Sequence, residues 1–211
     1  RINRQVEGVV AEIEGQVPDL LLLQECSTAW HRALRTRLAA RYPHIEYLGR
    51  RYDMGLAMYS KRPFVGDITG GDFDDDPPAP PMRGEIDIAG ERVAIYNTHM
   101  YQPYGLRKAM LRRRQFAGIL ALLDNESLPV VLGGDFNATE TSPLDAELRS
   151  AGFADAYDVG GWGHGGTWPD ASIFRHLPGV RIDHVYLRGG LTCTSAEVGT
   201  GVGSDHRPVI A

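Results

Sequence analysis

The stretch Gly203-Ser204-Asp205-His206-Arg207-Pro208, close to the end of the chain, is the one around which the fold is organised. It places a carboxylate, which is a hard oxygen ligand, beside an imidazole that titrates near neutral pH. The proline that follows favours a bend or a strand edge over a helix. An Asp-His pair carries little weight by itself, so its meaning depends on the strand ends upstream.

Four further polar clusters each interrupt an apolar, strand-like run. Unpaired charge is costly to bury, and strand ends that open into one crevice are where α/β sheets bind ligands. Five such ends in one chain predict a shared site. The four clusters are Leu23-Gln24-Glu25, Asn97-Thr98-His99, Gly133-Gly134-Asp135-Phe136-Asn137 and Arg181-Ile182-Asp183-His184.

Length and composition indicate one soluble globular domain over residues 1–211. The formal net charge of −5 argues against broad binding to a nucleic acid backbone. No apolar run reaches the roughly 18 residues of a membrane span, and no signal peptide is visible. Because the chain opens directly in a helical pattern, we expect sequence upstream of it, which could carry a targeting or membrane-anchoring segment. The compartment therefore stays open.

Helices and strands are predicted from apolar periodicity and from Gly and Pro punctuation. Two packed sheets with helices outside them are the predicted architecture. The predicted helices cover Asn3–Gly15 with Asn3 as N-cap, Ala29–Arg41, Gly105–Asp124, and Pro143–Ala151 with Ser142 as N-cap. The predicted strands are Leu20–Leu23 (buried on both faces), Ile45–Arg50, Gly55–Ser60, Glu85–Ile88, Arg92–Tyr96, Pro129–Leu132, Ile182–Leu187, Leu191–Val198 and Arg207–Ile210.

The loops carry predictions of their own. Glu85–Ile88 and Arg92–Tyr96 should form a hairpin around Ala89-Gly90-Glu91. The acidic, proline-rich residues 70–81 indicate a surface loop, and the glycine-rich residues 160–166 a flexible one. Thr167-Trp168-Pro169 should close that loop onto the body.

Asp135 and Asn137 stand two apart at a strand end, so their side chains can point to one side of the pleat. A carboxylate with an amide suits a site that holds an attacking water. The alternative is an Asx turn, in which both residues cap local backbone. Gly133 and Gly134 would permit close approach of a neighbouring strand or a ligand.

Glu25 supplies a carboxylate that favours Mg²⁺ or Mn²⁺ over zinc, and His99 and His206 are the histidines best placed to act on a phosphate. Asp183 could hold an imidazole in one tautomer, or pair with Arg181 instead. The basic residues of the third helix make either a solvated face or a phosphate-attracting one. Residues without an assigned site role are Cys26 and Cys193, expected in or near the core, and His31, His44, His164, His176 and His184, expected to be surface or structural.

In order along the chain, the five motifs resemble the endonuclease/exonuclease/phosphatase superfamily with its DNase I-like fold. The resemblance implies a four-layer α/β sandwich of two mixed sheets, and hydrolysis of phosphoesters with Mg²⁺ or Mn²⁺. It also implies a first strand with a metal-binding Asn, and this chain starts after that point. The strand after Gly55 lacks the Asn often found there.

The resemblance assigns a role to each matching residue. Glu25 and Asp205 would bind the metal, and Asp135 and Asn137 would orient the water and contact the phosphate. His99 would bind or protonate a phosphoryl oxygen. Asp183 would orient His206, which would act as general base or electrostatic stabiliser.

The expected function is that of a phosphatase or phosphodiesterase acting on small-molecule, lipid-linked or nucleic acid phosphoesters, with no obligate protein partner. Residues 166–169 with Arg181-Ile182-Asp183-His184 also resemble bacterial members that carry an N-terminal membrane segment. The alternatives are a nuclease of the same superfamily and a non-catalytic binding module with the same fold.

Overall fold

Two β-sheets packed face to face form the centre of the structure, a computed structural model that describes residues 6–49, 54–70, 79–170, 179–201 and 203–211. The smaller sheet is antiparallel, in the order β1-β3-β2. The larger one has the order β4-β5-β6-β8-β7. The strands of the two sheets are β1 Leu20–Leu23, β2 His44–Leu48, β3 Leu56–Ser60, β4 Met82–Ile88, β5 Glu91–His99, β6 Val130–Asp135, β7 Ala154–Asp155 and β8 Asp183–Arg188.

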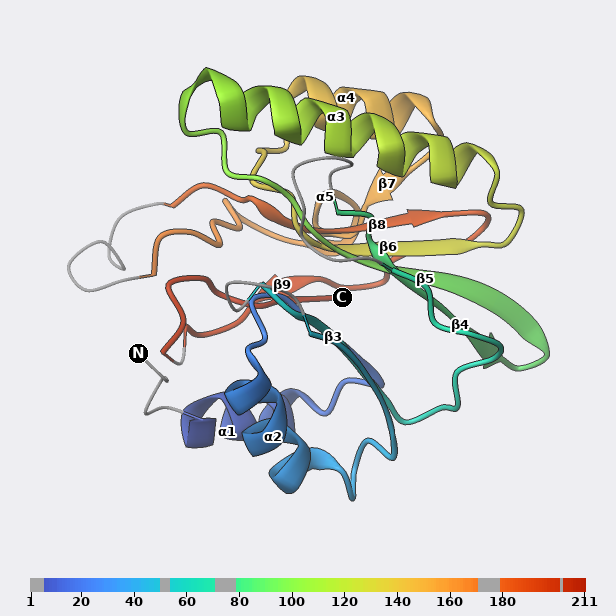
Figure 1. The fold of residues 1–211 in the computed structure, drawn as a ribbon, viewed down its shortest axis with the longest axis vertical. Helices are drawn as coiled ribbons and strands as arrows, with labels where there is room; N and C mark the ends of the chain where they lie inside the picture. The colour runs from blue at the N-terminus through green and yellow to red at the C-terminus, as the bar shows by residue number, and fades with distance from the viewer. Residues whose placement is uncertain (1–5, 50–53, 71–78, 171–178, 202) are drawn as a thin grey trace.

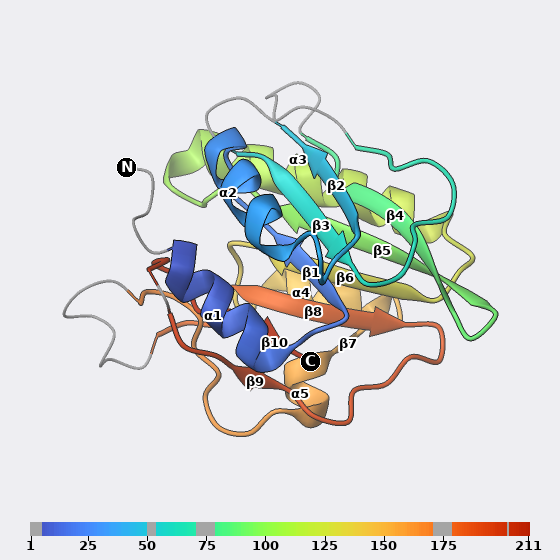
Figure 2. The same ribbon diagram turned by 90° about the horizontal axis from the view of Figure 1, so that it is seen from below.

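Helices cover the outer face of each sheet, which gives four layers (Figure 1). Helices α1 and α2 lie on the smaller sheet, and α3 and α4 on the larger one (Figures 1 and 2). A short pair, β9 Glu197–Val198 and β10 Val209–Ile210, completes the strands. The helices are α1 Val6–Gln16, α2 Thr28–Leu38, α3 Gly105–Asp124, α4 Pro143–Ser150 and α5 Ala156–Gly160. The predicted layered architecture is confirmed.

Three apolar clusters fill the spaces between these layers. One holds α1 and α2 on the smaller sheet, and another holds α3 and α4 on the larger sheet. The third lies between the sheets and includes Met58 of β3 and Ile95 of β5. Because β1 alternates, Leu21 and Leu23 face the first cluster while Leu20 and Leu22 face the third. Both faces of β1 therefore pack as predicted, although Leu21 is buried and the other three leucines are half-buried.

Local sequence accounts for several element ends. Ser142 accepts a hydrogen bond from the Asp145 amide and Pro143 occupies the first turn, as predicted for α4. Ala89 and Gly90 both have positive φ (56° and 91°), which suits the two-residue turn that closes the β4–β5 hairpin. The hairpin is confirmed, with strands longer than predicted. α2 begins after its cap, Ser27, and ends at Leu38, three residues short of the prediction.

Strand register brings the polar strand ends together. β5 and β6 are parallel, with His99 beside Asp135, and β8 runs antiparallel to β6, with Asp183 beside Asp135. Gly134 makes this pairing possible, because a Cβ there would lie 1.9 Å from the Thr98 carbonyl oxygen. A Cβ on Gly133 would meet Leu22 of the other sheet at 2.6 Å. The predicted close approach at both glycines is confirmed.

Some predicted elements differ from the structure. The strand predicted over Leu191–Val198 is wrong for most of its length, since only Glu197 and Val198 form β9. Gly189 and Gly190, both with positive φ, turn the chain after β8, and the segment that follows pairs with no strand. Strand β7 and helix α5 were not predicted, because two and five residues are too few for a periodic pattern. The predictions for Asn3, residues 51–53, residues 71–78 and His176 lie outside the described residues.

Candidate active site

The predicted site residues lie at one edge of the two sheets. His99 and Asp135 are the last residues of β5 and β6, and Asp183 is the first residue of β8. Glu25 follows β1 by two residues, and His206 lies in the loop before β10. Side chains from five distant parts of the chain thus meet where the sheets are packed together.

A carboxylate–imidazole group forms the centre of this edge. His206 Nδ1 lies 2.8 Å from Asp183 Oδ2. Ligand atoms of Asp135, Asp183 and His206 all lie within 4.8 Å of one another. His99 Nε2 lies 3.5 Å from Asp135 Oδ2 and 3.7 Å from Glu25 Oε1. The sequence left open whether Asp183 pairs with His206 or with Arg181. It contacts His206, while Arg181 pairs with Asp158 and Asp155.

Asp135 and Asn137 form the local turn that was one of the two predicted interpretations. Asp135 Oδ1 accepts from the Asn137 amide at 2.8 Å, and Asp135 Oδ2 accepts from Asn137 Nδ2 at 3.0 Å. Asn137 Nδ2 also donates to the Met100 carbonyl, and the φ of Asn137 is 48°. The turn holds the Asp135 carboxylate with Oδ2 3.5 Å from His99 Nε2, and the site role of Asp135 stays a prediction. Asn137 therefore orients the Asp135 carboxylate through two hydrogen bonds.

The electrostatic environment separates the proton affinities of Asp135 and His206. Burial raises the pKa of Asp135 to about 7, and the negative charge of Asp183 adds to that rise. Burial would lower the pKa of His206, but its hydrogen bond to Asp183 and the charge of Asp183 outweigh burial and raise it to about 9. At neutral pH, Asp135 is therefore poised to accept a proton and His206 carries a positive charge.

Glu25 is held in an uncommon backbone conformation, with a φ of 50°. Gly55 fixes it there, since the Gly55 carbonyl accepts the Cys26 amide at 2.9 Å and a Cβ on Gly55 would lie 2.4 Å from the Cys26 oxygen. Burial raises the pKa of Glu25, and the charge of Asp205 raises it further.

This donor set fits a hard divalent cation. Glu25 and Asp205 offer carboxylate oxygens, which Mg²⁺ and Mn²⁺ prefer. Cys26 is the one thiol next to the site in sequence, and it points into the core between α1, α2 and the smaller sheet. Burial raises its pKa to about 12, so it offers no thiolate to a softer metal. The predicted core position of Cys26 is confirmed, whereas Cys193 is half-buried.

Asn97 joins the two sheets directly beneath the site. Its Nδ2 donates to the carbonyl oxygens of Leu23 at 3.1 Å and Ala57 at 3.0 Å, and its Oδ1 accepts from Gln24 at 2.6 Å. Asn97 is fully buried, so these bonds are shielded from water. They fix the end of β1, and with it Glu25, against β5.

Gln115 of α3 has a similar role that sequence reasoning missed. Its side chain accepts the Tyr101 amide at 3.0 Å and donates to the carbonyl oxygens of His99 at 3.0 Å and Ala79 at 3.1 Å. The signal was a polar residue on the core-facing side of α3, between Leu111 and Ile119. Gln115 fixes the backbone at which β5 ends and the loop to α3 begins.

The histidines without an assigned role lie away from the centre of the site. His184 is buried between Asp155 Oδ2 at 2.7 Å and the Ala138 carbonyl at 3.0 Å, and it stacks on Tyr186. His31, a buried residue of α2, stacks on Tyr47. His44 lies on β2, and His164 contacts the Gly179 carbonyl. The predicted structural or surface character of these four is confirmed.

Solved structures share this fold at low sequence identity. An endonuclease/exonuclease/phosphatase from Beutenbergia cavernae DSM 12333 superposes with a TM-score of 0.79 at 20% identity, covering 97% of this chain and 64% of that one. Truncated Caenorhabditis elegans TDP2 superposes with a TM-score of 0.74 at 22% identity, covering 97% and 88%. This chain thus spans about two thirds of the bacterial protein's length. At such identities the likeness establishes the fold.

The sequence is also similar to a protein family and to part of a plant protein. An uncharacterized calcium-binding protein of Arabidopsis thaliana is 32% identical over 85 residues, which are 37% of this chain and 17% of that protein. The profile of the Endonuclease/Exonuclease/phosphatase family matches residues 2–206, a span that includes every residue of the site. The chain therefore belongs to the Endonuclease/Exonuclease/phosphatase family.

Proposed function

We propose that this chain is a Mg²⁺- or Mn²⁺-dependent phosphoester hydrolase, a phosphatase or phosphodiesterase. The observation that carries the proposal is the Asp183–His206 pair at 2.8 Å beside the buried carboxylate of Asp135. It combines an imidazole whose pKa is raised to about 9 with a carboxyl group whose pKa is raised to about 7. These are the two groups that an attack of water on phosphorus requires. Members of this family generally hydrolyse phosphoesters, which supports the same reading.

Glu25 and Asp205 would hold the cation, which would supply positive charge against the phosphoryl oxygens. Asp135 takes the proton of the attacking water while the water oxygen forms its bond to phosphorus. The bond from phosphorus to the leaving oxygen breaks on the opposite side, and that oxygen takes a proton from solvent water as the alcohol departs. Asn137 holds Asp135 in the orientation that this proton transfer needs.

The two histidines act on the phosphoryl group. His206, with a raised pKa, donates a hydrogen bond from Nε2 and stabilises the negative charge that develops on the phosphoryl oxygens. Asp183 fixes its tautomer by accepting from Nδ1. His99 is almost fully buried with Nε2 3.5 Å from Asp135 Oδ2, so it would act on the phosphoryl group through that carboxylate. Of the two roles open to His206, stabiliser fits its raised pKa better than general base.

Hydrolysis assays with and without chelator test the proposal. A phosphomonoester, a phosphodiester and abasic duplex DNA would be offered with Mg²⁺, with Mn²⁺ and with excess chelator. We expect turnover that needs the cation, and losses of about 10²–10⁴-fold in kcat for His206→Ala and Asp135→Asn. His44→Ala, on the far edge of the smaller sheet, is the matched control and should retain activity. Full turnover in both site variants would refute the mechanism.

A nuclease remains the second candidate function. In a nuclease, the basic residues of α3 would bind the phosphate backbone of the nucleic acid. The structure gives that role limited support, because Arg112 donates to the Asn137 carbonyl and Arg113 pairs with Glu147. Plasmid nicking that weakens steeply with salt would favour the nuclease. A non-catalytic module would instead show no heat of Mn²⁺ binding in calorimetry and no turnover.

A further inference from the structure

His184 is a buried titratable side chain that the proposed mechanism does not use. It is 2% exposed, and its partner on β7, Asp155, is 1% exposed. The ring stacks on Tyr186 with centroids 5.3 Å apart and meets the Phe136 ring edge-on at 5.7 Å. These contacts and two hydrogen bonds hold the imidazole in one orientation, on the side of the larger sheet that faces α3 and α4.

Both nitrogens of this imidazole face hydrogen-bond acceptors. Nε2 lies 3.0 Å from the carbonyl oxygen of Ala138, which can only accept. Nδ1 lies 2.7 Å from Asp155 Oδ2. Burial would raise the pKa of Asp155, but its hydrogen bond to His184 and the charges of His184 and Arg181 lower it overall, so this carboxylate also accepts. A histidine donates from both nitrogens only as the imidazolium, so the ring carries a positive charge.

The Ala138 carbonyl belongs to the turn that holds Asp135. In this turn Asn137 has a φ of 48°, a left-handed conformation that persists where surrounding contacts enforce it. Arg112 of α3 donates to the Asn137 carbonyl. His184 donates to the next carbonyl along the chain, that of Ala138. The two cations thus fix the backbone from which the Asn137 amide and side chain reach the Asp135 carboxylate.

The backbone of His184 also presents Asp183 to the site. Adjacent residues of a strand point to opposite faces of the sheet, so anchoring the His184 side chain on one face fixes where Asp183 leaves the other. The Phe136 amide donates to the Ile182 carbonyl at 2.9 Å. Thr167 Oγ1 accepts the amides of Ile182 at 3.1 Å and Asp183 at 3.3 Å. The start of β8 is therefore fastened on both sides of Asp183.

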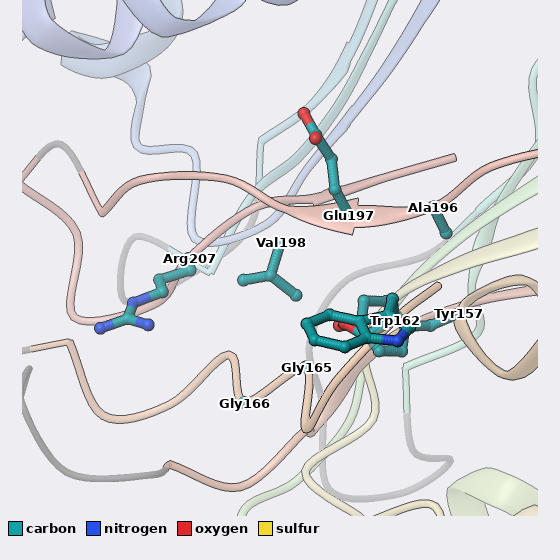
Figure 3. Close-up of a pocket in the computed structure, with 8 residues that line it drawn as sticks. All are labelled: Tyr157, Trp162, Gly165, Gly166, Ala196, Glu197, Val198 and Arg207. Atoms are coloured by element: carbon teal, nitrogen blue, oxygen red, sulfur yellow. The ribbon is translucent and has the colours of Figure 1, made fainter. Parts of the chain in front are cut away.

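Asp155 anchors the other end of the imidazole. Its carboxylate accepts the Tyr157 amide at 2.8 Å as the cap of α5, and Arg181 Nη2 lies 3.7 Å from it. Tyr157 also lines an open cavity of about 410 Å³, which is drawn in Figure 3 and whose walls include neither Asp155 nor His184. The Asp155–His184 pair is therefore closed to water on that side, and hydrogen bonds in such surroundings hold their geometry strongly.

We propose that His184 is a positioning residue, whose Nε2 bond to Ala138 holds the Asp135 carboxylate in the geometry that turnover needs. The inference rests on the proposed function and adds to it a residue outside the predicted site. The Nδ1 bond to Asp155 keeps the imidazole charged and in place. The carboxylate that takes the proton of the attacking water is thus aligned by a charged ring that does not touch the substrate.

Two amide substitutions at His184 separate its two bonds. The side-chain nitrogen of Gln reaches the place of Nε2, and that of Asn reaches the place of Nδ1. For the phosphoester that the unaltered chain turns over fastest, we expect His184→Gln, which keeps a donor for Ala138, to retain kcat within about threefold. His184→Asn, which keeps only the donor for Asp155, should lower kcat by about tenfold or more and leave KM within about twofold. Equal kcat in the two variants, or a larger loss in His184→Gln, would overturn the inference.

Stability and a second histidine provide the controls. Each variant loses one buried hydrogen bond, so both should lower the urea midpoint of unfolding by similar amounts. An effect through stability alone would therefore reduce kcat alike in both. His31→Asn changes another buried histidine, on α2, and should leave kcat unchanged.

Nuclear magnetic resonance tests the same geometry without turnover. Ring ¹H–¹⁵N correlation spectra of the intact chain, recorded with Mg²⁺ at neutral pH, should show protons on both nitrogens of His184. A neutral ring, or one without a proton on Nε2, would overturn the inference even if a variant does not fold. The backbone amide of Asn137 should shift in His184→Asn and stay near its original position in His184→Gln. An amide that responds alike in both variants would contradict the positioning role.

The two proposals can fail separately. If the unaltered chain hydrolyses no phosphoester, the proposed function fails, and the resonances of His184 and Asn137 still decide whether the imidazole holds the turn. If the chain turns over and the two His184 variants behave alike, the function stands and the positioning role is lost.

Discussion

Gly134 has the most demanding backbone position in the site, because β5 and β6 come together there. Its φ of 142° and the 1.9 Å gap from a Cβ to the Thr98 oxygen leave no room for a side chain. We expect Gly134→Ala to lower the free energy of unfolding by about 3 kcal/mol or more, measured by urea unfolding. Gly118→Ala is the matched control, since nothing lies within 4 Å of its Cβ position on α3. That change should stabilise the chain by up to about 1 kcal/mol.

Single residues also show where sequence reasoning succeeds and where it stops. Asp183 and His206 were paired correctly from their motifs. Of the two alternatives for Asp135 and Asn137, the Asx turn is confirmed, and the site role stays a prediction. Gln115 and Thr167 were missed as supports of the site, because a single polar residue in a helix or loop has no spacing to distinguish it. Their partners are backbone atoms, whose positions depend on the finished fold.

Among the elements, α3 supports the site through Gln115, although none of its residues belongs to the predicted site. We expect Gln115→Leu to lower kcat by about tenfold or more, because the backbone of His99 and Tyr101 loses its partners. Stability should fall by about 2–3 kcal/mol as buried polar groups lose their bonds. Steady-state kinetics and circular dichroism would be measured on the same samples.

The control for Gln115→Leu is Leu123→Ala at the other end of α3. Leu123 is fully buried under the larger sheet, so its truncation should cost about 2–5 kcal/mol. It lies at the C-terminal end of α3, 24 residues beyond His99 in sequence, and packs in the apolar cluster under the larger sheet. The kcat of the folded fraction should therefore stay unchanged. An equal drop in kcat for both variants would mean that Gln115 acts through stability alone.

Strands and helices were predictable in proportion to their length. β5, β6 and α3 carry long apolar patterns, and their existence was predicted with ends shifted by a few residues. β7, β9 and β10 have two residues each and exist because a neighbouring strand is present to pair with. Such tertiary pairing overrides local preference, which is why Leu191–Val198 suggested a strand that does not form.

For the molecule as a whole, a buried ion pair beside β8 links stability to pH. Asp155 is fully buried, and burial alone would raise its pKa, but the hydrogen bond and charge of His184 and the charge of Arg181 lower it overall. A carboxyl with a depressed pKa stabilises the fold above its unfolded pKa of about 3.9, and this contribution is lost as pH falls through the lower folded value.

We therefore expect Asp155→Asn to lower the free energy of unfolding by roughly 3 kcal/mol at pH 7. The difference in this free energy between the variant and the unaltered chain should narrow below about pH 4. Urea unfolding at several pH values would measure this. Asp124→Asn, at the exposed end of α3, should leave the whole pH profile in place. A difference in the free energy of unfolding that stays constant down to pH 3 would show that Asp155 acts by packing, not by charge.

The four layers were predictable, because the order of apolar runs and polar strand ends is a property of the whole chain. The way the layers are joined was not. None of the helices in the described part of the chain is long and apolar enough to cross a membrane. The seam between the sheets depends on Asn97, whose bonds to Leu23 and Ala57 follow from no pattern in the sequence.

That seam has a consequence for how activity arises in a newly made chain. Asn97 and Leu23 are 74 residues apart, and contacts of such long range form slowly, after helices and hairpins. Glu25 reaches the other catalytic groups only when both halves have docked. Under the proposed function, hydrolysis would therefore be expected only after the two sheets have packed together.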